Sequence, residues 1–203
     1  MNTSNRFHRQ KGFTLIEILL ALTVIAALAV AAFIVYPRVQ ATKDATNELK
    51  IITAAQANIK AIWSSGIYNT MTPAAVGLGD IFPKYMNAVP GSSSLRNRWE
   101  GQIRVIYSKS NGEIPLDIGA GGKARYFQIR YQRVPKAVCT LMVGEASQIF
   151  GTILVGKNPN SPTAPDDIVQ DLYSTTEVPL DAAKVSENCK GTNGTASIIF
   201  VSK

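Results

Sequence analysis

The hydrophobic positions of this chain fall into two patterns, an unbroken apolar run near the N-terminus and mixed apolar and polar sequence after it. Residues 18–36, ILLALTVIAALAVAAFIVY, contain no charged side chain and a single Thr. A run of this length is sufficient to cross a lipid bilayer as a helix. We therefore expect a membrane-spanning helix over residues 13–36.

A second pattern follows Pro37, where mostly apolar residues recur at spacings of three and four. Residues at these spacings share one face of a helix, so residues 37–64 are predicted to be amphipathic with one buried stripe. Pro37 would normally end or kink a helix, and Ser64-Ser65-Gly66 is a stop signal. We predict one long helix over residues 13–64, kinked near Pro37, and a span followed by a separate helix is the alternative. The stripe comprises Leu49, Ile52, Gln56, Ile59 and Trp63, with Lys43, Asp44, Lys50 and Lys60 elsewhere on the surface.

Residues 65–203 carry the signals of a globular head that mixes helices and strands. Alternating or β-branched runs predict strands, and Asn111-Gly112 is a turn signal. The region between residues 157 and 167 is rich in Pro, Asn and Asp, which predicts a surface loop. Strands are expected at 102–107, 125–131, 150–155 and 196–201, and helices at 73–86, 136–148 and 180–188.

The formal charge of +7 is concentrated at the N-terminus. Residues 1–12 contain Arg6, Arg9 and Lys11 and no acid, which leaves +4 for the remaining chain. The other basic residues are scattered, so the charge gives little support for a nucleic-acid surface. We expect no specific nucleic-acid partner.

Candidate catalytic groups are scarce. His8 is the only histidine, which leaves no His-based triad or His-ligated metal site in the rest of the chain. The glycine-rich segment 119–124 has Ala124 where a phosphate loop needs Ser or Thr. Asp166-Asp167 lacks the spacing of a calcium loop. We predict no enzyme activity, no catalytic residue, no metal and no cofactor.

The two cysteines, Cys139 and Cys189, are fifty positions apart. Neither belongs to a CxxC pair and no His is near them, which argues against a zinc or redox motif. If this part of the chain is exported, a disulfide is expected because the compartment is oxidising. In the chain-entropy model such a bond would stabilise the fold by about 4 kcal/mol. Two free buried thiols in a cytosolic domain are the alternative.

An acidic residue, Glu17, lies at the start of the apolar region. A carboxylate at the centre of a bilayer costs roughly 2.5–3.5 kcal/mol on insertion scales, so such a residue suggests a function. A secretory signal peptide could end at the A-x-A pattern Ala29-Val30-Ala31. Glu17 and the continued apolar sequence 33–36 argue against that interpretation, and a plain membrane anchor does not explain Glu17.

The N-terminal sequence resembles the type IV prepilins. MNTSNRFHRQKG followed by FTLIEILLALTVIAALAVAAF matches their short basic leader ending in Gly, then Phe, a TLIE-like segment and a long apolar helix. The resemblance implies that a prepilin peptidase removes residues 1–12 by cutting between Gly12 and Phe13 and methylates the amine of Phe13. It also implies that Glu17 of an incoming subunit meets the Phe13 amine of its neighbour. Pairing within one chain is also possible, because residues four apart share a helix face.

The order of expected elements resembles the type IV pilin fold throughout, most strongly in residues 6–36. The resemblance implies an α+β fold, with a long N-terminal helix packed on an antiparallel sheet and a disulfide-bounded region between Cys139 and Cys189. NRWEGQIRV and VPKAVCTLMV are similar to the type IVb branch, including the thin-pilus subunits of conjugative plasmids and enteric bacteria. The twelve-residue leader is short for that branch, and Phe at the cut is typical of type IVa.

This resemblance implies a structural subunit that polymerises into an extracellular helical filament for adhesion, aggregation or conjugative contact. Lys and Arg before the span should stay cytoplasmic, which places the head outside the inner membrane. The expected partners are identical subunits, the inner membrane before assembly, the prepilin peptidase, the assembly machinery and minor pilins. A minor pilin or secretion pseudopilin is the first alternative, and a membrane-anchored periplasmic binding protein or enzyme is the second.

Overall fold

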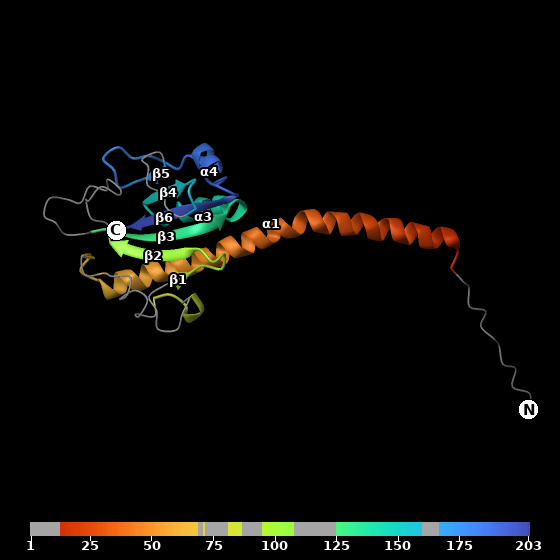
Figure 1. The fold of residues 1–203 in the computed structure, drawn as a ribbon, viewed down its shortest axis with the longest axis horizontal. Coiled ribbons are helices and arrows are strands. Elements are labelled where there is room, and N and C mark those ends of the chain that lie inside the picture. The colour runs from red at the N-terminus through yellow and green to blue at the C-terminus, as the bar shows by residue number, and fades with distance from the viewer. Residues whose placement is uncertain (1–12, 69–70, 72–80, 87–94, 108–124, 160–166) are drawn as a thin grey trace, which may run out of the picture. The chain divides into compact units, whose positions relative to one another are not determined.

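The computed structural model describes residues 13–68, 71, 81–86, 95–107, 125–159 and 167–203 (Figure 1). The chain divides into two compact units, residues 1–40 and 41–203. The elements in order are α1 (Leu15–Ile62), a 3₁₀ turn η1 (Lys84–Met86), β1 (Leu95–Arg96), β2 (Gln102–Tyr107), β3 (Phe127–Pro135), α3 (Lys136–Ala146), β4 (Thr152–Gly156), β5 (Ile168–Asp171), α4 (Ala182–Asn188) and β6 (Thr195–Ser202).

The long N-terminal helix predicted from the sequence is confirmed as α1, with Pro37 inside it. Its last turn is extended by a hydrogen bond from the Trp63 N–H to the Ile59 carbonyl at 2.9 Å. The backbone then reverses at Gly66, whose φ of 66° lies in the left-handed region that glycine adopts at little cost. The helix therefore ends beside the predicted Ser64-Ser65-Gly66 stop.

The second half of α1 packs into the core of the head unit. The predicted stripe is buried at Leu49, Ile52, Gln56 and Ile59, whereas Trp63 is only partly buried. The small residues Ala45 and Ala55 lie on the same buried face. The larger side chains of this face belong to the same buried cluster as the inner residues of the sheet.

The sheet has six strands in the order β1-β2-β3-β6-β4-β5, and every neighbouring pair is antiparallel (Figure 1). The last strand of the chain, β6, lies between β3 and β4. One cluster of buried side chains joins α1, α3 and α4 to the inner face of this sheet. The C-terminal strand therefore connects the two halves of the sheet, and the helices cover one face of it.

The strand predictions are confirmed for four segments with shifted boundaries. The strand β3 runs beyond residue 131 to Pro135, because pairing with β6 resumes after an irregularity between Tyr131 and Val134. Within this irregularity Arg133 has a φ of 56°. The strands β1 and β5 were not predicted from the sequence. Most of the predicted helix 73–86, the Asn111-Gly112 turn and most of the 157–167 loop lie outside the described residues.

Candidate functional site

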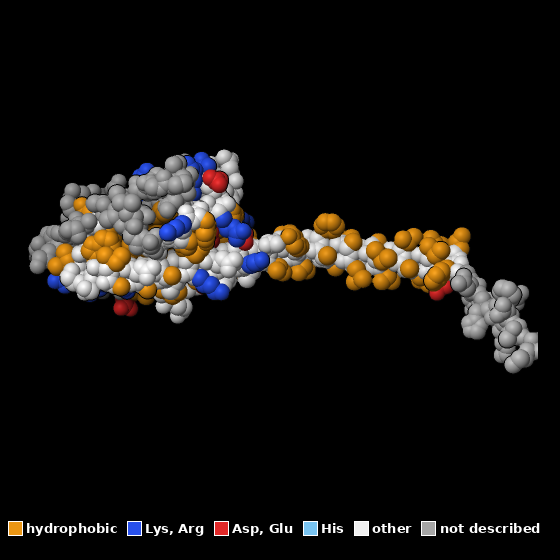
Figure 2. Space-filling model, turned by 90° about the horizontal axis from the view of Figure 1, so that it is seen from below, with side chains coloured by type: hydrophobic (Ala, Val, Ile, Leu, Met, Phe, Trp, Pro, Cys, Tyr) orange, Lys and Arg blue, Asp and Glu red, His pale blue; other side chains and the backbone are white. Residues whose placement is uncertain are grey.

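The N-terminal part of α1 exposes apolar side chains around its whole circumference. Phe13 is 79% exposed and Phe33 is 81% exposed, and the large apolar residues between them are exposed as well. Figure 2 shows these side chains along the N-terminal part of α1. In the described part of the chain, α1 is the one helix long and apolar enough to cross a membrane, judged by length and composition. Such a surface requires lipid or protein around it.

The start of α1 is organised by Thr14, the residue just before the helix. Its Oγ1 accepts a hydrogen bond from the Glu17 N–H at 3.4 Å, and its carbonyl accepts from the N–H groups of Glu17 and Ile18 at 3.1 and 3.3 Å. Thr14 and Glu17 have the spacing of a capping box, in which an N-terminal Thr satisfies helix N–H groups. Glu17 therefore lies in the first turn, where the helix dipole favours negative charge.

Phe13 is the first described residue and precedes this first turn. Gly12 and the rest of residues 1–12 lie outside the described part of the chain. Both Phe13 and Glu17 are exposed. Glu17 thus lies four residues after Phe13, in the first turn of an exposed apolar helix.

One acidic residue of α1 that the sequence did not single out, Glu48, lies inside the head. Glu48 is only 3% exposed, and its Oε2 accepts a hydrogen bond from the Tyr131 hydroxyl of β3 at 3.2 Å. The backbone N–H of Arg98 also donates to this carboxylate, and the Arg98 side chain pairs with Asp44 one turn earlier on α1. Its position on the buried face, four residues before Ile52, was the signal that could have identified it.

Burial is the main cause of the raised pKa values of Glu48 and Tyr131. Loss of solvent raises the pKa of Glu48 above its ordinary value of 4.5, although the Tyr131 hydrogen bond and Arg98 oppose the change. The pKa of Tyr131 is raised well above its usual range, first by burial and then by the Glu48 charge. The pair is thus a buried polar link between α1 and the sheet, with the Arg98–Asp44 pair beside it.

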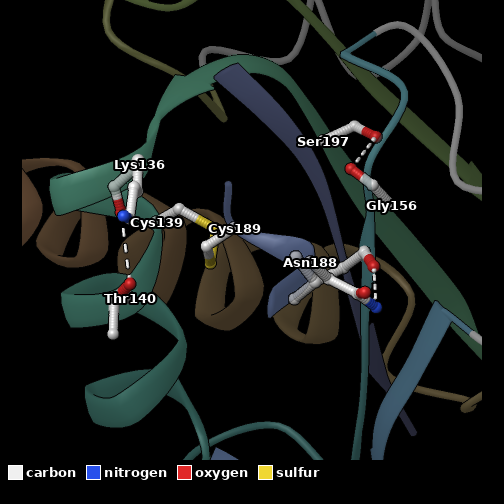
Figure 3. The surroundings of a disulfide bond; sticks show 8 residues. Lys136, Cys139, Thr140, Gly156, Asn188, Cys189 and Ser197 are labelled. Carbon is white, nitrogen blue, oxygen red and sulfur yellow. Dashed lines mark hydrogen bonds between the residues drawn. A yellow bond between two sulfur atoms is a disulfide. The ribbon is translucent and has the colours of Figure 1, made fainter. Parts of the chain in front are cut away.

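Cys139 and Cys189 are joined by a disulfide, with the sulfurs 2.00 Å apart and the Cα atoms 5.7 Å apart. Cys139 lies on α3 and Cys189 directly follows α4, and both are fully buried. Beside the bond, Asn188 Nδ2 donates to the Val155 carbonyl of β4 at 2.9 Å, and Figure 3 shows this neighbourhood. The bond and the amide together fix α4 to α3 and to the sheet, as expected for a disulfide-bounded C-terminal region.

The remaining candidates for chemistry gain no support. The thiols are used in the disulfide, and the described residues contain no group of three or more His, Cys, Asp or Glu side chains placed to hold a metal ion. Residues 119–124 and Asp166 lie outside the described part of the chain. The predicted absence of an active site or cofactor stays a prediction.

Comparison with known families identifies the chain. The family described as PilS N terminal matches residues 41–203, and the prokaryotic N-terminal methylation motif matches residues 7–33. The chain belongs to the PilS family of type IV pilins. The methylation motif covers Gly12, Phe13 and Glu17, the residues that carried the resemblance in the sequence.

Two solved pilins share the fold. The type IVb pilin from Salmonella typhi is 21% identical with a TM-score of 0.50, and the alignment covers 76% of this chain and 97% of that one. TcpA, a type IV pilin from Vibrio cholerae El Tor biotype, is 12% identical with a TM-score of 0.54, covering 79% of this chain and 99% of that one. Among curated proteins, none matches the sequence. The type IV pilin fold is therefore confirmed, one of these two neighbours is a type IVb pilin, and pilins are structural proteins.

Proposed function

We propose that this pilin polymerises through its N-terminal helix into an extracellular filament. The observation that carries the proposal is the exposed apolar surface of residues 13–39, which includes Phe13, Phe33 and Val39. In the membrane this surface contacts lipid, and in a filament it is buried between helices of neighbouring subunits. The family membership supports a pilus subunit, and the mode of polymerisation is our inference.

The chain is processed before it assembles. A prepilin peptidase cuts between Gly12 and Phe13, removes the basic residues 1–12 and methylates the new amine of Phe13. The match to the methylation motif over residues 7–33 supports this step. Before assembly the chain is a single-pass inner-membrane protein, because Arg6, Arg9 and Lys11 favour the cytoplasmic side and direct the head to the periplasm.

Glu17 gives each incoming subunit its position. The α-amine of a processed Phe13 is largely cationic near neutral pH, since its unperturbed pKa is about 8. An unpaired carboxylate is costly in an apolar environment, so the Glu17 carboxylate gains most when it meets the Phe13 amine of a subunit already in the filament. The alternative is a pair within one chain, because Glu17 lies only four residues after Phe13.

The other parts of the chain support this assembly. Residues 13–36 form the membrane and assembly helix, and residues 37–64 continue this helix along the head. Residues 65–203 form the head, which includes the disulfide-bounded region 139–189. The head is presented on the filament surface for adhesion, aggregation or mating contact. Identical subunits, minor pilins and the pilus assembly machinery are the partners.

Replacement of Glu17 tests the proposal. Glu17→Gln and Glu17→Val should insert and be processed normally, because removing a charge makes the span more compatible with lipid. In cells that also produce wild-type subunits, a tagged variant should be depleted from sheared filaments relative to its share of the membrane pool. A tagged wild-type chain is the matched control.

Equal incorporation of the variant and the control would contradict the role of Glu17 between subunits. Glu17 would then act in recognition by the peptidase or in methylation.

A further inference from the structure

A groove runs along the exposed side of α1 within the head, beside the segment 81–84. Its volume is about 470 Å³, which is in the range of small-molecule sites. All of its lining residues belong to the head unit, residues 41–203, so the groove is separate from the apolar N-terminal part of α1. The residues that shape it are Lys50, Ala54 and Asn58 from α1, and Ile81, Phe82 and Lys84 from the facing segment.

The groove exists because α1 has short side chains on this side. Lys50, Ala54 and Asn58 are four residues apart, so they form one exposed line along the helix. At a rise of 1.5 Å per residue this line is about 12 Å long. The facing wall is formed by Ile81 and Phe82, which are both buried. The result is an elongated and mostly apolar channel that lies open to solvent.

Each wall of the groove carries a lysine. Lys50 lies on α1 and Lys84 begins η1, and both are exposed. Among the residues that the structure describes, neither lysine takes part in an ion pair or a hydrogen bond, whereas Lys157 pairs with Glu187. An apolar channel between two such cations is complementary to an anion that has an apolar body.

We propose that this groove binds a fatty acid, with its carboxylate between Lys50 and Lys84 and its acyl chain along the channel. The carboxylate is ionised near neutral pH, because the unperturbed pKa of a carboxyl group is about 4. Its two oxygens offer an acceptor to each ammonium group, and such charge-assisted hydrogen bonds are the strong ones. The methylene groups displace water from Ala54, Ile81 and Phe82, which favours binding.

The surface of the head favours this small amphiphile over a loop from a second copy of the chain. A docking loop needs a protruding apolar anchor, and an acid beside it to meet the lysines. Glu177 is exposed, but its apolar neighbour Val178 is only 41% exposed. The most exposed large apolar side chain in the described head is Tyr85, at 76%, and it directly follows Lys84. It therefore lies next to the groove and not beside an acid.

Photolabelling of the full-length chain, with one chain in each lipid nanodisc, tests the site. The probe is dodecanoic acid with a diazirine in its chain, and mass spectrometry locates the labelled peptides. The head should be labelled at 50–58 and 81–84. Residues 13–36 should also be labelled by probe dissolved in the bilayer, and this signal is the internal standard. Excess dodecanoate should suppress the head label, whereas dodecanol should not, because it lacks the charge.

Three variants separate recognition from net charge. Lys50→Gln with Lys84→Gln should reduce head labelling, relative to the standard, about tenfold or more, because the charge-assisted hydrogen bonds are lost. Ala54→Leu keeps both charges but fills the channel from an exposed position, and should reduce labelling as well. Lys184→Gln with Lys190→Gln removes the same charge elsewhere on the head and should leave labelling unchanged. Thermal unfolding by circular dichroism checks that each variant is folded.

Two kinds of result would overturn the proposal. One is head labelling that falls equally in the two Lys→Gln pairs, that persists in the folded Lys50 and Lys84 variant, or that dodecanol suppresses as well as dodecanoate does. The other is found in discs that hold several chains. A carbodiimide crosslink from Lys50 or Lys84 of one chain to Glu177 of another, unaffected by dodecanoate, would assign the groove to a second copy.

Discussion

The hydroxyl of Tyr131 donates to the carboxylate of Glu48 at 3.2 Å inside the head, which links α1 to the central part of the sheet. Glu48 contributes the carboxylate from a helix face whose other buried residues, apart from Gln56, are apolar. A buried polar group is costly unless its partner is present, so this bond fixes one position of the helix relative to β3. Asp44 and Arg98 hold the same region of α1 from the loop between β1 and β2.

Removing either partner of this bond should destabilise the head. Tyr131→Phe and Glu48→Ala are each expected to lower the free energy of unfolding by about 1–3 kcal/mol, because the remaining polar group stays buried without its partner. A double-mutant cycle measured by denaturant unfolding of the detergent-purified chain should show coupling between the two sites. Additive losses would show that the bond contributes nothing to stability.

The raised pKa of Glu48 predicts a pH dependence with a definite sign. A carboxyl whose pKa is higher in the folded chain than its ordinary value of 4.5 favours folding most when protonated. Its contribution is therefore fully present below about pH 4.5 and is lost as the pH rises through the raised pKa. Glu48→Gln should gain stability relative to wild type as the pH rises from 4 to 7. A stability difference that is constant over this range, measured by chemical unfolding, would contradict the shift.

Gly101 should not tolerate a side chain. A Cβ at this position would lie 1.9 Å from the Gln132 carbonyl oxygen, and the neighbouring backbone cannot move without disturbing β3. Asn97 organises the same turn, accepting from the Gly101 N–H at 2.8 Å and donating to Gln132 at 2.7 Å. Gly101→Ala should therefore cost about 1–3 kcal/mol of stability.

Gly144 provides the matched control for this substitution. It lies on α3, and a Cβ there would meet no atom within 4 Å. Gly144→Ala should leave thermal stability unchanged or raise it by about 0.5–1 kcal/mol, since alanine favours a helix. Equal losses at Gly101 and Gly144 would show that the close approach to Gln132 is unimportant.

The disulfide should be required for a stable head. Cys139→Ser with Cys189→Ser is expected to cost about 2–5 kcal/mol and to reduce the amount of subunit recovered. The cause is the release of the region between α3 and α4, which the bond closes over a separation of 50 residues. Non-reducing peptide mapping checks the bond itself, and free thiols in periplasmic protein would contradict it.

The parts of the fold that could be predicted from the sequence have strong local signals. The helix α1 combines an apolar run with a stripe of spacing three and four, and its predicted burial is correct at Leu49, Ile52, Gln56 and Ile59. Phe13 and Glu17 could be proposed as assembly residues from the sequence because they lie in one short contiguous motif, and their roles stay predictions. The disulfide between Cys139 and Cys189 was expected because this part of the chain was predicted to be exported to an oxidising compartment.

The missed elements owe their structure to distant partners. The strand β5 ends in Gln170 and Asp171, which are polar yet buried. Gln170 donates to the Phe150 carbonyl at 2.9 Å, and Asp171 accepts from the Thr152 hydroxyl at 2.7 Å. These contacts replace the apolar alternation on which strand prediction depends.

Glu48 was missed for the same reason. Its carboxylate is satisfied by Tyr131, 83 residues further along the chain. A charged residue inside an apolar stripe suggests a surface position until that distant partner is known. The two-residue strand β1 is similarly defined by its pairing with β2 rather than by its own sequence.

The identity of the main protein in sheared surface filaments tests the polymerisation of this pilin most directly. Electron microscopy should show filaments in the sheared fraction, and intact-mass analysis should identify their main subunit as this chain beginning at Phe13 with one added methyl group. Gly12 replaced by a bulky residue should leave the uncut precursor in the membrane and abolish the filaments. Filaments built from another protein, or a mature chain that begins at Ala32, would contradict the account.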